Sequence, residues 1–153
     1  MLRRIVGFHQ DDIEDWVAEL DCLHGQHVRH QPPFWPRPWS VTTSGRDGRI
    51  GTDLECPSCD RAELPGGLVR ARTAGPFEAA ALPPGLRREH RVAPGTWAVV
   101  RVAAGEVHLA IATSSPIERH LAAGDEQAIP PDVPHRLSVS DDAVVAVDFL
   151  VRA

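Results

Sequence analysis

The chain has 153 residues, of which 42% are hydrophobic and 24% are charged, and its formal net charge is -5 at pH 7. This length suits one domain or two small ones, and the acidic balance argues against a protein that binds bulk nucleic acid. All sixteen basic residues are arginine and no asparagine occurs, which excludes a phosphate-loop lysine, a Schiff-base lysine and a Cys-His-Asn nucleophile.

We expect neither a membrane-spanning nor a secretory segment. No run approaches the roughly 18 apolar residues that a membrane helix needs. Residues Met1 to Arg4 lead into a strand-like segment rather than into the apolar core of a signal peptide. We therefore expect a cytoplasmic protein that does not contact a membrane.

The chain begins with two predicted strands, Leu2 to Phe8 and Trp16 to Leu20, joined by an acidic turn. A two-stranded hairpin is only marginally stable by itself. A small domain of this kind commonly relies on a metal ion, whose binding free energy becomes folding free energy. We therefore expect metal ligands next to these strands.

A cluster of cysteines and histidines follows the second strand. Cys22-x-His24-x-x-His27-x-x-His30 is followed after a loop by Cys56-Pro-Ser-Cys59. A Cys-x-x-Cys turn with a second Cys/His group is typical of tetrahedral zinc sites. We predict a structural Zn²⁺ held by four of Cys22, His24, His27, Cys56 and Cys59.

Two choices remain open at this cluster. Among the histidines we favour His27, then His24, and place His30 last because it leads directly into the proline-rich stretch. The alternative for the thiols is redox cycling of the Cys-x-x-Cys pair. Such redox motifs begin a helix in a βαβ unit, and none is visible here.

The loop between the two halves of the cluster combines arginines with aromatic residues, among them Phe34, Trp35 and Trp39. Such a surface can stack on bases and contact phosphates. The ordinary interpretation is that the tryptophans form the core and the arginines form a solvated rim, since the four prolines of this loop require aromatic anchors. We favour this packing interpretation. Nucleic acid is therefore not the expected partner, but it stays an open alternative.

The composition changes after about residue 62. All three cysteines precede this point, whereas the later chain is rich in Val, Ala, Pro and Gly. The polar and Pro/Gly-containing stretch between them is of linker type. We expect a Cys/His-rich domain at 1–62 and a second domain at 68–153.

The second part is a succession of short apolar segments bounded by glycine and proline. Strands at intervals of roughly 8 to 12 residues indicate an all-β sandwich or barrel without helices. The predicted strands are Leu68 to Ala71, Leu86 to Val92, Trp97 to Val102, Val107 to Ala112, Ile117 to Leu121, Gln127 to Ile129, His135 to Val139 and Val144 to Val151.

Two family resemblances support this division. I-V-G-F-H-Q-D at Ile5 to Asp11, the Cys22 to Pro33 run and R-P-W at Arg37 to Trp39 resemble an uncharacterised bacterial family of short N-terminal domains. The segment from Gly124 to His135 is similar to the second sequence motif of the cupins, which are small jelly-roll barrels.

Further matches narrow the cupin resemblance. Leu82-Pro-Pro-Gly-Leu86, Arg88-Glu-His90, Gly95-Thr-Trp97 and Val102-Ala-Ala-Gly-Glu106 resemble the TehB/YeaR-like cupins, which are associated with tellurite resistance and with the response to nitrate or nitric oxide. The resemblance implies a mainly β fold, in which a small zinc-stabilised β-hairpin domain precedes a cupin-type double-stranded β-helix, or jelly roll.

The resemblance also implies a metal site inside the barrel, but the expected ligands are depleted. Of the two histidines of the first cupin motif, only His90 is present. The position expected for the glutamate of that motif falls near Ala98, which is apolar. His135 matches the histidine of the second motif. Asp148 lies in an apolar strand, where a carboxylate should be paired, protonated or metal-bound. His90, His135 and Asp148 could hold Zn, Fe or Mn as a facial triad. Alternatively, the histidines make ordinary hydrogen bonds and Asp148 pairs with an arginine.

Three functions follow from these predictions. The favoured one is a metal-binding stress-response protein with a structural zinc domain, whose barrel binds a small molecule, an oxyanion or a metal. The second is a metal-dependent oxygenase or isomerase that uses the barrel metal. The third is an interaction protein that uses the Arg/Trp surface. Exposed jelly-roll edges make a homodimer a plausible assembly.

Overall fold

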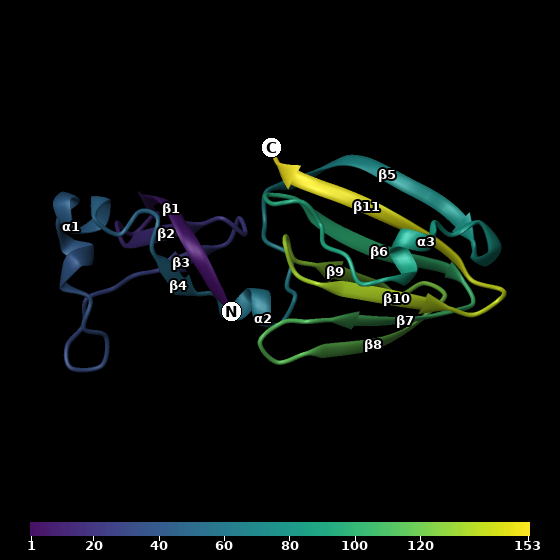
Figure 1. Ribbon diagram of the computed structural model, residues 1–153. Helices are drawn as coiled ribbons and strands as arrows, with labels where there is room; N and C mark the ends of the chain where they lie inside the picture. Colours follow the sequence, from purple (N-terminus) through teal and green to yellow (C-terminus); the bar gives the residue numbers. More distant parts are fainter. The chain divides into compact units, whose positions relative to one another are not determined.

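The computed structural model describes residues 1–153, and the chain divides into two compact units, Met1–Cys56 and Pro57–Ala153 (Figure 1). Strands dominate both units, and the helices are single turns. No helix has the length and apolar character needed to cross a membrane.

The first unit is built on a four-stranded antiparallel sheet of order β3-β2-β1-β4. Its strands are β1 (Leu2–Gln10), β2 (Trp16–Leu20), β3 (Gly25–His27) and β4 (Asp53–Glu55). The predicted hairpin of β1 and β2 is therefore present. The two outer strands have three residues each and are too short to show an alternating pattern.

The loop between β3 and β4 contains a 3₁₀ turn (Pro38–Val41) and helix α1 (Thr43–Asp47). The Thr42 hydroxyl caps α1 by accepting a hydrogen bond from the Gly45 amide at 3.0 Å. The guanidinium of Arg46 is buried against the Trp16 ring, with Cζ 3.5 Å from the ring centroid, and donates to the Ser40 carbonyl.

The aromatic residues of this loop are only partly packed. Phe34 and Trp35 are 84% and 55% exposed, whereas the Trp39 ring packs edge-on against Phe8. The expectation of tryptophans as core and arginines as rim is therefore wrong in part. Arginine–aromatic stacking replaces some of the aliphatic core, because a guanidinium plane can cover an aromatic face while its N–H groups reach backbone carbonyls.

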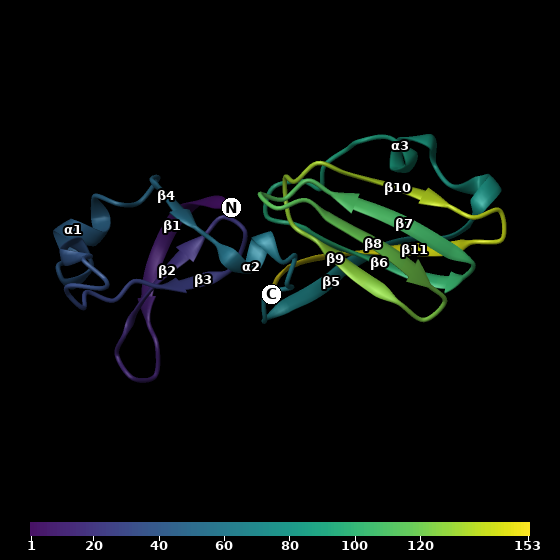
Figure 2. The same cartoon turned by 90° about the horizontal axis from the view of Figure 1, so that it is seen from below.

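The second unit begins with helix α2 (Pro57–Asp60) and contains two antiparallel sheets (Figures 1 and 2). One has the order β5-β11-β6-β9 and the other β10-β7-β8. Their strands are β5 (Leu68–Glu78), β6 (Trp97–Ala104), β7 (Glu106–Ile111), β8 (Ile117–Ala122), β9 (Glu126–Ile129), β10 (His135–Val139) and β11 (Val144–Arg152).

Apolar side chains at alternate positions of the strands form the core of this unit. Val107, Leu109 and Ile111 of β7 are buried, as are Val100 and Val145 on β6 and β11. Successive strand residues point to opposite faces, so these side chains fill the space between the sheets. The prediction of a mainly β chain with a cupin-type jelly roll is confirmed.

One predicted strand of the second unit is wrong. The segment Leu86 to Val92 does not form a strand: helix α3 occupies Pro84–Arg87, and His90 forms only an isolated bridge with His135. Pro84 lies at the first turn of α3, where its fixed φ suits a helix and its missing N–H costs no hydrogen bond.

Candidate functional site

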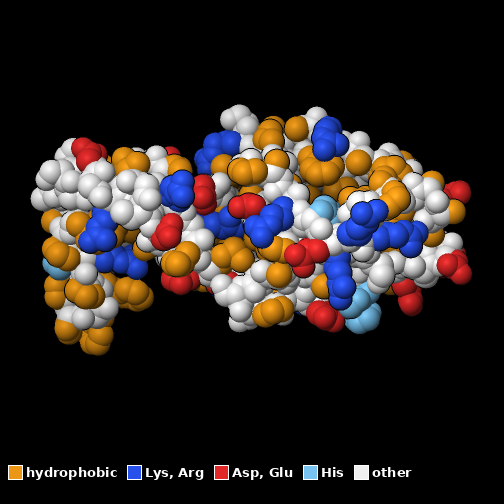
Figure 3. Space-filling view, viewed as in Figure 1, with side chains coloured by type: hydrophobic (Ala, Val, Ile, Leu, Met, Phe, Trp, Pro, Cys, Tyr) orange, Lys and Arg blue, Asp and Glu red, His pale blue; other side chains and the backbone are white.

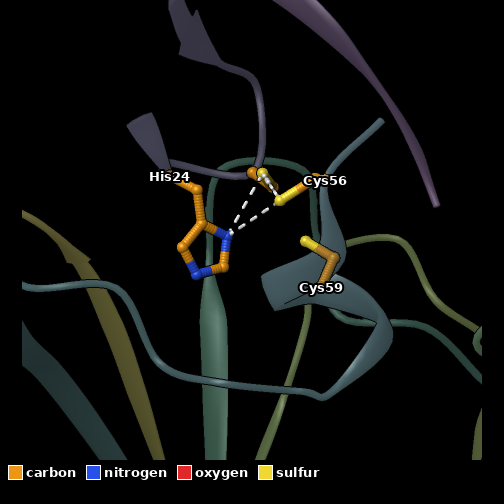
Figure 4. A group of neighbouring side chains, drawn as sticks. His24, Cys56 and Cys59 are labelled. Carbon is orange, nitrogen blue, oxygen red and sulfur yellow. Dashed lines mark hydrogen bonds between the residues drawn. The ribbon is translucent and has the colours of Figure 1, made fainter. Parts of the chain in front are cut away.

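The cysteines and one histidine converge on a single point. Cys22 and His24 lie in the turn between β2 and β3, Cys56 follows β4, and Cys59 lies in α2. The ligand atoms of these four buried residues all lie within 4.8 Å of one another. Figure 4 shows His24, Cys56 and Cys59 pointing toward a common centre. We call these four residues the Cys/His cluster.

The distances within the Cys/His cluster fit a tetrahedral metal. Zn–S bonds of about 2.3 Å and Zn–N bonds of about 2.0 to 2.1 Å place sulfurs about 3.8 Å apart and sulfur and nitrogen about 3.6 Å apart. The Cys22 and Cys56 sulfurs are 3.8 Å apart, and His24 Nδ1 lies 3.5 and 3.4 Å from them. These thiols are well beyond the roughly 2.05 Å of a disulfide. The residues present therefore fit Zn²⁺.

The histidine of the cluster is His24, and the preference for His27 is corrected. His27 Nε2 lies 2.9 Å from a carboxylate oxygen of Asp11, on the exposed side of the sheet. This hydrogen bond is the main cause that lowers the pKa of Asp11. His30 is also engaged elsewhere, since its Nδ1 accepts a hydrogen bond from the Arg37 amide at 3.0 Å.

The second unit contains a cavity of about 460 Å³ on the inner face of the β5-β11-β6-β9 sheet. Ligand pockets of proteins commonly have volumes of about 300 to 1,000 Å³. Strands β6 and β11 contribute apolar side chains to its wall, and β10 and the segment after α3 contribute two histidines. The residues that line it include Leu86, His90, Val92, Ala98, Val100, Ile129, His135, Leu137, Val147 and Phe149.

The two predicted barrel histidines lie side by side in this cavity. The ring centroids of His90 and His135 are 4.1 Å apart, and their backbones exchange two hydrogen bonds. His135 Nδ1 lies 2.9 Å from the Val133 carbonyl, and His90 Nδ1 lies 2.9 Å from the Arg88 carbonyl. We assign the Nδ1–H tautomer to the neutral form of each ring, in which the Nε2 lone pair is available.

His135 is held in the neutral form. Burial lowers its pKa to about 4, against a smaller upward effect of the Val133 carbonyl. The neighbouring His90 lowers the pKa of His135 further. At neutral pH this imidazole is therefore a hydrogen-bond acceptor or a metal ligand rather than a cation.

Asp148 does not join the histidines, and its prediction as a third ligand is corrected. Its neighbours Val147 and Phe149 line the cavity, whereas the Asp148 carboxylate faces the opposite side of the sheet. There it accepts hydrogen bonds from the Thr73 hydroxyl at 2.5 Å and from Arg101. Burial raises the pKa of Asp148, but these hydrogen bonds outweigh it and the pKa falls below its usual value.

The facial triad expected inside the barrel is therefore not assembled. His90 and His135 offer two nitrogen ligands, and the structure brings no carboxylate to them. The other two histidines of the second unit, His108 and His120, lie outside the cavity and stack on each other with ring centroids 4.5 Å apart. His108 also pairs with Glu118 at 3.0 Å.

Sequence reasoning missed two residues of the cavity, Arg72 and Phe149. Both line it, and the Arg72 guanidinium lies over the Phe149 ring with Cζ 3.8 Å from the centroid. No local motif marks them, because they lie on β5 and β11, which are separated by most of the second unit in sequence. An arginine opposite a phenylalanine becomes visible only when the strand register is known.

Comparisons with protein families and solved structures bear on both parts of the chain. Residues 72–147 match the family described as TehB-like domain, and residues 6–63 match a protein family of unknown function, DUF3565. Comparison with curated proteins gives no match.

Solved structures similar to the chain include a protein of Escherichia coli K12, with 21% identity and a TM-score of 0.54. The match covers 60% of this chain and 97% of that protein. TehB of Haemophilus influenzae has 19% identity and a TM-score of 0.51 over 58% of this chain. Only 33% of the length of that TehB is matched.

At these identities the likeness establishes the fold alone. The resemblances predicted from the sequence motifs are nevertheless confirmed in both parts of the chain. Residues 72–147 are similar to the TehB-like domain family, and residues 6–63 are similar to the DUF3565 family.

Proposed function

We propose that this protein binds a small molecule in the cavity of its jelly roll, and that a structural Zn²⁺ at the Cys/His cluster stabilises its N-terminal part. The observation that carries the proposal is the cavity of about 460 Å³, which has an apolar wall and only a few polar groups. Apolar cavities with a small number of placed polar groups are the usual form of ligand sites.

The zinc part rests on the chemistry and burial of the ligands. Cys22, Cys56 and Cys59 are 0 to 1% exposed, and a set of three thiolates and one imidazole leaves no open position for substrate. The first unit has a small sheet with two three-residue edge strands. Metal binding would supply much of the stability that such a sheet lacks.

A barrel metal is a second candidate, favoured by one observation. Each cavity histidine directs its Nδ1 to a backbone carbonyl, which is the arrangement typical of metal-binding histidines. Two imidazoles would leave most of the coordination of a Zn, Fe or Mn ion to water or ligand. We keep the metal-dependent oxygenase or isomerase as the alternative function on this ground.

The exposed loop of the first unit offers a third candidate, an interaction surface. Phe34 and Trp35 are exposed, and Arg37 lies over the Trp35 ring with Cζ 5.7 Å from the centroid. Binding to a single-stranded oligonucleotide that weakens with salt, and is lost in Trp35→Ala, would support this role. A homodimer through sheet edges is likewise a proposal, to be tested by light scattering.

The test begins with purified full-length protein. Elemental mass spectrometry gives the number and identity of metals per chain, and native mass spectrometry detects any small molecule retained from the cell. We expect one Zn²⁺ per chain and a cavity that binds small apolar probes such as octanol at one site. A second metal that is lost in His135→Ala would favour the enzyme instead.

The cavity is tested with Val147→Trp, which fills it from the wall. This variant should lose probe binding and keep its zinc. The control is Val69→Trp on β5, where an exposed valine does not line the cavity. Equal probe binding in both variants, or no binding by the native chain, would contradict the proposal.

A further inference from the structure

The structure points to the chemical class of the cavity ligand. We infer that the cavity takes an organic monocarboxylate, whose carboxylate pairs with Arg72 and whose apolar body lies along the wall toward Val100 and Leu137. This inference rests on the proposed small-molecule function and goes beyond it by naming the ligand class and the residue that recognises it.

A β-bulge places Arg72 at the cavity. Along the β5–β11 pair, Phe149 is opposite Arg72 and the next residue, Leu150, is opposite Arg70, so Ala71 is an extra residue in β5. Successive strand residues normally face opposite sides. Here both Ala71 and Arg72 line the cavity. Bulges commonly re-aim a side chain beside a binding site, and this one brings a cation to a largely apolar wall.

The Arg72 guanidinium is oriented but not neutralised. It lies over the Phe149 ring, with Cζ 3.8 Å from the ring centroid, and makes no ion pair with a carboxylate. Stacking on an aromatic face fixes the plane of a guanidinium while its N–H groups stay available. A guanidinium held in this way matches a carboxylate with two parallel hydrogen bonds.

The other cationic groups of the cavity are not suited to this task. Arg91 also lines it, but its Nη1 already lies 3.3 Å from the Asp132 carboxylate. His135 is neutral because burial lowers its pKa to about 4, and its Nε2 is an acceptor that cannot donate to a carboxylate. Arg72 is therefore the group that can recognise a negative charge.

The size and wall of the cavity favour an organic anion over an inorganic one. An inorganic oxyanion would fill little of the cavity volume of about 460 Å³. It has no apolar surface to bury against Val100, Ile129 and Leu137. Each buried methylene of a ligand strengthens binding by about fourfold. Figure 3 shows arginine side chains among hydrophobic ones on the side where β5 lies.

The experiment compares matched probes by calorimetry with full-length, zinc-containing protein. The carboxylates acetate, butyrate, hexanoate and octanoate are titrated beside octanamide and octanol. We expect affinity to rise by about fourfold for each added methylene until the cavity is full. Octanoate should bind at least about tenfold more tightly than octanamide, because only the carboxylate forms a charged pair with Arg72.

Two variants assign the effect to Arg72. Arg72→Gln should bring octanoate down to the affinity of octanamide and leave octanamide unchanged. Arg70→Gln is the matched control, since Arg70 lies two residues away, pairs weakly with Asp148 at 3.9 Å and does not line the cavity. Arg70→Gln should retain the preference for octanoate.

The possible failures are distinguishable. If octanamide and octanol bind as well as octanoate, and Arg72→Gln changes nothing, the cavity binds small molecules but the carboxylate assignment is overturned. If phosphate binds and octanoate does not, the organic class is overturned. If no organic probe binds, the proposed cavity function fails together with this inference.

Discussion

At the scale of single residues, hydrogen bonds decide which histidine can serve which purpose. His24 presents Nδ1 to two cysteine sulfurs, whereas His27, three residues later, is bound to Asp11. Both residues belong to the same Cys/His-rich run of sequence. Only the turn between β2 and β3 distinguishes them, because it directs one ring inward and leaves the other on the exposed side.

A pair of substitutions tests this assignment. His24→Ala should lower zinc affinity by at least tenfold, since it removes one of four ligands from a closed tetrahedral site. His27→Ala should keep one zinc per chain, because it removes only the contact with Asp11. Zinc content after dialysis against a competing chelator measures both. Greater loss in His27→Ala would return the ligand assignment to the residue favoured by the sequence.

The buried imidazole of His135 predicts a dependence of stability on pH. Its pKa is about 4 in the folded chain and 6.5 in the reference state, so the unfolded chain binds an extra proton between these values. Stability from this group is therefore complete above pH 6.5 and falls as the pH is lowered toward 4. The loss between pH 7 and pH 5 is about 2 kcal/mol.

Urea unfolding of the native chain and of His135→Gln at several pH values isolates this effect. Other groups, including the cysteines of the zinc site, titrate alike in both proteins. The difference between the two unfolding free energies should therefore shrink by about 2 kcal/mol from pH 7 to pH 5. A constant difference over this range would show that His135 is not held neutral by burial.

At the scale of elements, the two faces of β11 separate binding from structure. Val147 and Phe149 line the cavity, whereas Asp148 between them is paired with Arg101 and Thr73 on the other face. One strand thus supplies cavity wall and ion pair from consecutive residues. The buried carboxylate has a structural partner on its own face of the sheet.

Asp148→Asn tests that structural role. It should lower the free energy of unfolding by about 1 to 2 kcal/mol, a value discounted because the Arg101 side chain is 43% exposed. Asp132→Asn is the control, since its pair with Arg91 is more than half exposed on both sides and is worth less than about 0.5 kcal/mol. Loss of a metal from the barrel in Asp148→Asn would restore the predicted ligand role.

At the scale of the whole molecule, the chain is two units with different sources of stability. The jelly roll fills its core with aliphatic side chains such as Leu109, Ile111 and Val145. The first unit instead combines a small sheet, three of the four residues of the Cys/His cluster and an arginine stacked on Trp16. Their responses to loss of metal should therefore differ.

Removal of zinc with EDTA should unfold residues 1–56 and leave residues 68–153 folded, because the second core does not depend on metal. Limited proteolysis with mass spectrometry measures this. Cleavages should appear within the first unit while a fragment beginning near Leu68 persists, and added Zn²⁺ should restore protection. Simultaneous loss of both units would contradict separate stabilisation.

The sequence alone determined the features that depend on the local spacing of residues, namely the metal cluster, most of the strands and the fold type of the second part. The Cys-x-x-Cys turn predicted a metal cluster because its two thiolates are close by chain connectivity. Alternating apolar residues bounded by glycine and proline predicted seven of the strands in the second part, because a strand with one buried face imposes a period of two. The motif at Gly124 to His135 predicted the cupin-type fold.

Only the tertiary structure decided which residues lie together in the two sites, because this depends on strand register and on the direction of side chains. It placed His24 rather than His27 beside the cysteines, turned Asp148 away from the cavity, and brought Arg72 over Phe149 through a bulge. A shift of one residue reverses the face of every side chain in a strand. The pairing of strands that are distant in sequence therefore determines which polar groups meet in the cavity. The sequence of each single strand does not.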